Sequence, residues 1–146
     1  MLTIYTDKHC EKVAQAIASG ASNVEHKITK IPEFTEQNVL CIAKKPFGNE
    51  LKQIADKLIG AVYVVGVGFS FDKMRKMIEE LQKDQPSIKV EVTLCLKRKG
   101  TLPLGGEVTE IELARVSALG ERIATTITGT RQRPQNEKNR IQNYNK

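Results

Sequence analysis

The chain has 146 residues, 40% of them hydrophobic and 27% charged, and its net charge is +6 at pH 7. This length fits one domain whose core needs no disulfide bonds. No apolar run approaches the roughly 20 residues that cross a bilayer, so no membrane partner is expected. The first residues predict a strand instead of a signal sequence. The three cysteines, Cys10, Cys41 and Cys95, are odd in number and form no CxxC pair. Neither a disulfide framework nor a zinc ribbon is therefore supported, and a cytoplasmic protein is expected.

Strand-like and helix-like segments alternate along residues 1–128, which is typical of parallel βαβ construction. Four segments carry apolar residues at helical spacing: 10–19, 49–59, 71–84 and 109–128. Three strand segments are almost continuously apolar, as strands covered on both faces are: 2–5, 39–43 and 61–67. Two further strand segments alternate apolar with polar residues and are expected at the sheet edges: 24–28 and 88–96.

With right-handed crossovers, these strands predict an α/β, doubly wound sandwich whose five-stranded parallel sheet has the order 2-1-3-4-5. About eight to ten residues, around Lys30–Asn38, join the second strand to the third. A parallel crossover usually takes about a dozen or more, so the helix there is expected to be short or missing. We also expect Phe71 to pack in the core. Thr109 and Glu112 form a capping box at the start of the last helix.

Residues 129–146 differ in composition from the rest of the chain. They hold five basic residues and one acidic residue, a local net charge of +4, and two apolar side chains, Ile141 and Tyr144. So little apolar surface does not offset the entropy of ordering eighteen residues. We therefore expect one folded domain over residues 1–128 and a disordered basic tail over residues 129–146.

Open α/β sheets bind ligands outside the carboxyl ends of their strands, where the strand order reverses. Here four loops reach that edge: 6–10, 44–49, 66–71 and 97–108. The first loop places Thr6, Lys8, His9 and Cys10 before a helix N-terminus, where backbone N–H groups and the helix dipole attract an anion. Asp7 adds a repelling charge. The alternative is an ordinary strand-to-helix turn with Asp7 as the helix cap.

Other residues of the sequence raise further possibilities for a site. Cys10, at a helix N-terminus beside two basic side chains, is either a reactive thiol or a plain first-turn residue. Gly66 and Gly68 begin a GxG, but Phe71 stands where a third glycine belongs, so the dinucleotide fingerprint is absent. No His, Cys and carboxylate set has metal-ligand spacing. Nucleic-acid binding is not expected, because no helix-turn-helix or aromatic-rich basic surface is apparent.

Two stretches resemble the flavodoxin family. Val39–Gly48, followed by Glu50-Leu51, is similar to the third strand, proline-bearing flavin loop and next helix of that family. Val92–Thr109, running into Glu110–Ala124, is similar to its last strand, final loop and C-terminal helix. The resemblance covers about residues 1–128. It implies a protein that binds flavin mononucleotide (FMN) and passes electrons to a redox partner protein, without substrate chemistry of its own.

The resemblance also implies where a flavin would lie. Its phosphate would bind in the first loop, and its ring near Pro46, Phe47 and Gly48 and near Gly68 and Phe69. Either aromatic ring could stack on the isoalloxazine; the alternative for Phe47 is that it covers the end of the sheet. Family members commonly hold the phosphate in a loop of the form Thr-Gly-Asn-Thr. Here Thr6-Asp-Lys-His-Cys10 lacks the glycine and is about two residues shorter.

The charge of the ligand-bearing edge leads to two functional hypotheses. Its loops carry basic residues that suit an anionic ligand or partner, or form a solvated rim: Lys44, Lys45, Lys97, Arg98 and Lys99. Electron carriers of the flavodoxin family are typically acidic. The basic net charge of this chain is therefore a second departure from the family pattern. The first hypothesis is an FMN-binding electron-transfer protein. The alternative is a flavin-free interaction or regulatory protein that binds a macromolecular partner through the basic edge.

Overall fold

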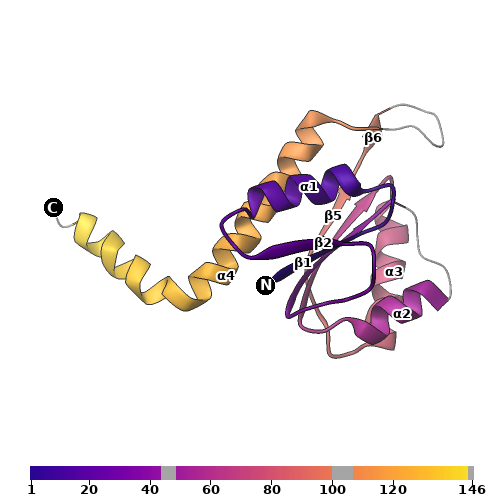
Figure 1. Cartoon of the computed structure of the whole chain (residues 1–146), viewed down its shortest axis with the longest axis horizontal. Helices are drawn as coiled ribbons and strands as arrows, with labels where there is room; N and C mark the ends of the chain where they lie inside the picture. Colours follow the sequence, from indigo (N-terminus) through magenta and orange to yellow (C-terminus); the bar gives the residue numbers. More distant parts are fainter. Residues whose placement is uncertain (44–48, 100–106, 145–146) are drawn as a thin grey trace.

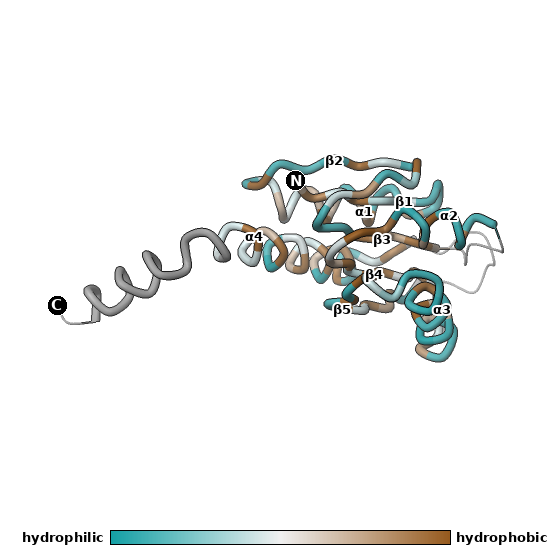
Figure 2. Tube along the Cα trace, turned by 90° about the horizontal axis from the view of Figure 1, so that it is seen from below, coloured by the Kyte–Doolittle hydropathy of each residue, from teal (hydrophilic) through white to brown (hydrophobic). Residues whose placement is uncertain are grey.

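The structure is a computed structural model that describes residues 1–43, 49–99 and 107–144. Five parallel strands form one sheet in the order β2-β1-β3-β4-β5, which confirms the predicted order. In Figure 2, β2 lies at the top of this sheet and β5 at the bottom, with β1, β3 and β4 between them. The strands are β1 (Leu2–Thr6), β2 (His26–Thr29), β3 (Gln37–Ile42), β4 (Ala61–Val67) and β5 (Lys89–Leu96). A short antiparallel pair lies apart from the main sheet: β6 (Arg98–Lys99) and β7 (Glu107–Val108).

Helices cover both faces of the sheet (Figure 1). One layer contains α1 (Glu11–Gly20) and α4 (Glu110–Tyr144), and the other contains α2 (Asn49–Lys57) and α3 (Phe71–Asp84). The helix α4 continues past residue 128, where we expect the folded domain to end. That residues 129–146 form a disordered tail stays a prediction.

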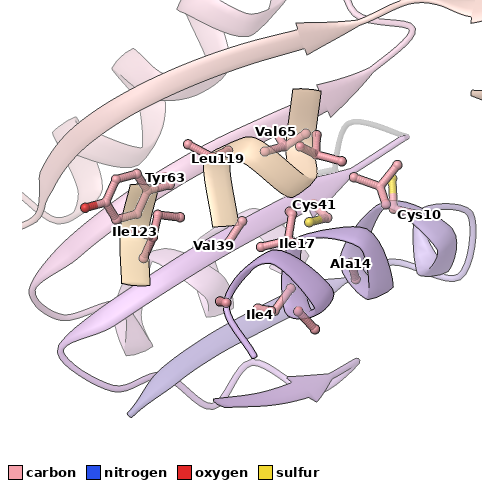
Figure 3. Close-up of a cluster of buried hydrophobic side chains, with 14 of the residues drawn as sticks. Ile4, Cys10, Ala14, Ile17, Val39, Cys41, Tyr63, Val65, Leu119 and Ile123 are labelled. Atoms are coloured by element: carbon pink, nitrogen blue, oxygen red, sulfur yellow. The ribbon is translucent and has the colours of Figure 1, made fainter. Parts of the chain in front are cut away.

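The sheet separates two apolar cores because successive side chains of a strand point to opposite faces. In β3, Val39 and Cys41 pack under α1 and α4, whereas Leu40 and Ile42 pack under α2 and α3. Figure 3 shows the first of these cores, with Ile17 of α1 close to the strands. Both faces of the central strands are thus apolar, which explains their continuous hydrophobic runs.

The connection from β2 to β3 contains no helix, as its length predicts. The face that such a helix would cover is partly polar: Thr3 of β1 pairs with Lys27 of β2, and Tyr5 pairs with Thr29. The Phe34 ring of the connection packs against Tyr5, with ring centroids 5.9 Å apart. This face therefore leaves little apolar surface for a helix to bury.

A buried asparagine fastens the short connection to the amino edge of the sheet. The Asn38 side-chain carbonyl accepts a hydrogen bond from the Thr35 N–H at 2.9 Å. Its amide donates to the carbonyl oxygens of Thr35 at 2.7 Å and Ile59 at 2.8 Å. The Thr35 hydroxyl lies 2.9 Å from the hydroxyl of the buried Thr3. Side-chain hydrogen bonds thus hold the connection where a crossover helix would otherwise pack.

The expectation that Phe71 packs in the core is wrong, because its side chain is 78% exposed. The buried residues of α3 are Met74, Met77 and Leu81. Met74 covers Gly66, the next-to-last residue of β4, so tightly that a Cβ on this glycine would collide with the Met74 methyl group. Phe71 lies almost one turn nearer the helix N-terminus and so projects past the end of the sheet.

Helices α1 and α4 approach each other at two glycines. A Cβ on Gly20 would collide with the carbonyl oxygen of Ser117, and a Cβ on Gly120 would collide with that of Ile17. Because both obstacles are backbone atoms, neither can move aside without shifting a helix. The close contact of α1 with α4 therefore requires residues without a Cβ at these two places.

We predict that Gly120→Ala lowers the free energy of unfolding by about 3 kcal/mol, at the upper end of typical overpacking costs. The control is Gly129→Ala in the same helix, where a Cβ meets no atom within 4 Å. That change should be neutral or stabilise by up to about 1 kcal/mol. Urea unfolding measures both variants. Equal effects of the two substitutions would contradict the close helix contact.

Candidate functional site

The strand order reverses between β1 and β3, so the carboxyl ends of these strands are the expected place for a ligand. Thr6 pairs with Cys41 as the last pair of the two strands. The turn from β1 into α1 therefore begins directly beside the residues that follow β3. This turn holds the predicted anion-binding residues.

The turn is closed by its own hydrogen bonds. The Asp7 N–H donates to the Cys41 carbonyl at 3.2 Å, and the Cys10 N–H donates to the Asp7 carbonyl at 3.3 Å. The hydroxyl of the buried Thr6 also donates to the Asp7 carbonyl, at 2.8 Å. The polar groups of Thr6 and Cys10 that would face a ligand are thus directed into the turn.

The Asp7 carboxylate bridges the turn and β3. One oxygen accepts the His9 N–H at 2.9 Å, and the other accepts the Ala43 N–H at 2.7 Å. The alternative in which Asp7 caps α1 is wrong in one respect, because the N-cap residue is Cys10 and it makes no side-chain capping bond. Asp7 instead joins the ends of two neighbouring strands.

The other predicted residues of this turn point in different directions. Lys8 and His9 are exposed, whereas Cys10 is 1% exposed and belongs to the core beneath α1 (Figure 3). Its burial favours the interpretation as a plain first-turn residue over that as a reactive thiol. Burial and, to a smaller extent, the charge of Asp7 raise the pKa of the Cys41 thiol.

The loop after β4 supplies Gly68 and Phe69. Gly68 is exposed, has a φ of +77°, and its N–H donates to the Leu96 carbonyl at 2.8 Å. The Phe69 ring is half-buried and packs against the core beneath α2 and α3. It therefore covers the end of the sheet with part of its surface. Several residues predicted for this edge lie outside the described residues: Lys44, Lys45, Pro46, Phe47 and Gly48.

A cluster around Glu112, which the sequence analysis missed, fixes the first turn of α4 beside the end of β5. The Glu112 carboxylate accepts the Lys97 N–H at 3.1 Å and the Arg115 guanidinium at 2.8 Å. The Glu112 N–H donates to the Thr109 hydroxyl at 3.3 Å, as one half of the predicted capping box. The hydrogen bond from Arg115, together with that from Lys97, holds the pKa of Glu112 below its ordinary value.

This lowered pKa predicts an acid dependence of stability. The ionised Glu112 stabilises the fold above the carboxyl's ordinary pKa of 4.5, and this contribution is lost as the pH falls through the lower folded-state value. Glu112→Gln should therefore be less stable than wild type at pH 7, and the difference should shrink on acidification below about pH 4.5. Thermal unfolding against pH measures it. Glu110→Gln, at an exposed position of the same helix, is the control; an equal loss in both variants would contradict the assignment.

The described residues form neither a metal site nor a membrane-spanning helix. Within the described ranges, no group of three or more His, Cys, Asp or Glu side chains could hold a metal ion. In the same part of the chain, no helix has the length and apolar character that crossing a membrane requires.

Comparison with known proteins finds similarity among solved structures. No family model matches the chain, and neither does any curated protein. Among solved structures, the chain is similar to the NMR solution structure of a diflavin flavoprotein A3 from Nostoc sp. PCC 7120, with a TM-score of 0.53. The match covers 90% of this chain and 95% of that one at 13% sequence identity. At this identity the likeness shows the flavodoxin-like fold and nothing finer.

Proposed function

We propose that this chain is a flavodoxin-like interaction domain, which binds a partner protein at the carboxyl edge of its sheet and does not hold FMN in the β1–α1 turn. The observation that carries the proposal is the state of that turn. The backbone N–H groups of Asp7, His9 and Cys10 already donate hydrogen bonds within the chain. The charge of a carboxylate stands where a phosphate would have to enter.

A phosphate in such a turn needs several backbone N–H groups that point toward it and small residues that let it come close. The Thr6 hydroxyl is directed to the Asp7 carbonyl, and Cys10 is turned into the core. Within the turn itself, whose residues the structure describes, Lys8 brings a positive charge next to Asp7 in the sequence. The described residues therefore do not fit the phosphate of FMN.

Exposed apolar side chains at the same edge support a protein partner. Phe71, at the start of α3, is 78% exposed, and Ile111, in the first turn of α4, is 76% exposed. The bond between Lys97 and Glu112 keeps this turn of α4 beside the end of β5. Contiguous exposed apolar surfaces mark interaction sites, with aromatic residues as anchors. We propose that Phe71 and Ile111 contribute apolar contacts to such a surface at this edge.

The charge of the edge indicates an acidic partner. The four loops hold six basic residues against Asp7 and Glu107: Lys8, Lys44, Lys45, Lys97, Arg98 and Lys99. Such an excess speeds association with an oppositely charged surface and weakens as salt is added. We therefore propose a protein partner that offers an apolar pocket within an acidic surface.

FMN-dependent electron transfer is the second candidate. It is supported by the solved structure that this chain resembles, which is described as a diflavin flavoprotein. Gly68, exposed and at positive φ beside Phe69, would also let a planar ring approach the backbone. A bound flavin would supply the electron chemistry, while this chain would supply Phe69 as a stacking surface.

The two candidates predict opposite results in a calorimeter. Titration of FMN into the wild-type protein should give no binding heat, and the purified protein should be colourless. A dissociation constant in the micromolar range or tighter, weakened by Phe69→Ala, would overturn the proposal and establish the flavin candidate.

The partner-binding proposal has its own variants. In a pull-down from source cells, Phe71→Ser and Lys97→Glu should affect the same partner protein. Each should lower the amount of this protein that is retained by at least tenfold relative to wild type. The matched controls are Ile59→Ser, an apolar side chain 50% exposed, and Lys83→Glu, exposed in the last turn of α3. Retention that the edge variants and the controls reduce equally would contradict binding at the carboxyl edge.

A further inference from the structure

We infer that Asp7 is a built-in replacement for a bound anion: its carboxylate occupies the anion position at the strand-order reversal and holds the β1–α1 turn to the end of β3. The proposed function needs only that the turn not bind FMN. The further step is that the N–H groups around Asp7 form an anion site, and that this site becomes available to phosphate when the carboxylate is removed.

The two oxygens of Asp7 serve different parts of the chain. The His9 N–H, at 2.9 Å, belongs to the turn that leads into α1, and the Ala43 N–H, at 2.7 Å, follows β3 and lies 36 residues away in the sequence. An ionised oxygen acceptor makes stronger hydrogen bonds than a neutral one. A phosphate bound between two loops would accept N–H donors from both in the same way.

Two ordinary roles for Asp7 do not account for this arrangement. A helix cap would bond to the first turn of α1, but the N-cap residue is Cys10 and it makes no side-chain capping bond. A local Asx turn accounts for the bond from His9, two residues on. It does not account for the bond from Ala43, which reaches across from β3.

The N–H groups of His9 and Ala43 point at the negative charge of the Asp7 carboxylate, which the chain itself supplies. The Asp7 main chain also bonds to its surroundings, through its N–H to Cys41 and its carbonyl to Thr6 and Cys10. These bonds fix the carboxylate in place. A second anion would meet both the repulsion of the carboxylate and donors that are already engaged.

The test is whether phosphate restores what Asp7→Ala removes. This variant should melt at a lower temperature than wild type, because the hydrogen bonds from the His9 and Ala43 N–H groups to the Asp7 carboxylate are lost. Inorganic phosphate should raise its melting temperature saturably and recover at least half of the loss, relative to sodium chloride at the same ionic strength. Wild type should show no such phosphate-specific rise.

The control is Asp72→Ala, which makes the same charge change in the first turn of α3, where Asp72 is exposed and pairs with Arg75 at 3.6 Å. It should not respond to phosphate. Rescue confined to Asp7→Ala supports the inference, whereas no rescue, or equal rises in all three proteins, overturns it.

If Asp7→Ala is unfolded in chloride, folding on addition of phosphate supports the inference. If it stays unfolded, Asp7→Ser takes its place in the same titration, and a lack of phosphate rescue there overturns the inference. The result is separate from the proposed function, because FMN binding is measured in the wild-type protein and phosphate rescue in the variants.

Discussion

The bond from the Ala43 N–H to the Asp7 carboxylate decides what the carboxyl edge of this sheet can offer to a ligand. Pairing of β1 with β3 brings the residues after each strand together. Parallel α/β sheets leave a crevice at this place, lined with backbone donors. Here a side chain of the chain itself enters between the two loops and takes donors from both. The fold is retained while the usual ligand position is filled from within.

The opposite edge of the sheet shows a similar use of a buried polar side chain. Asn38 joins the β2–β3 connection to the loop before β4, and its amide reaches the carbonyl oxygens of Thr35 and Ile59. A crossover helix would normally bury an apolar stripe on that side. Because the sheet face there presents Thr3 and Thr29, hydrogen bonds can replace the helix with little loss of apolar burial. Asp7 thus holds the β1–α1 turn at the carboxyl ends of the strands, where a ligand would otherwise bind. Asn38 holds the β2–β3 connection at their amino ends, where a crossover helix would otherwise lie.

Sequence alone predicts the sheet well, because the spacing of apolar residues along each strand follows which of its faces are buried. Continuous apolar runs mark the central strands, and the alternation in 88–96 marks an edge; the length of the β2–β3 link predicts the missing helix. Phe71 was misplaced because helical periodicity places a residue on a face of a helix but does not say where the sheet beneath it ends. The apolar stripe of α3 continues to Phe71, while the last strand residues it could cover stop near Gly66.

The site was less predictable than the fold, because its contacts join segments that are distant in sequence. Asp7 next to a helix N-terminus suggests a cap, and nothing local indicates that its partner is Ala43. Glu112 likewise suggests a capping box, although its carboxylate bonds to Lys97. The available signal was negative: the absence of glycine and the shortness of Thr6-Asp-Lys-His-Cys10 pointed away from a phosphate loop.

The internal filling of this edge can be observed directly in the wild-type protein. An amide proton–nitrogen correlation spectrum recorded while FMN is added reports on the N–H groups of His9 and Ala43. If Asp7 holds both groups, their signals stay in place up to millimolar FMN. Saturable shifts of both signals would show that an external phosphate reaches these donors and would contradict the account.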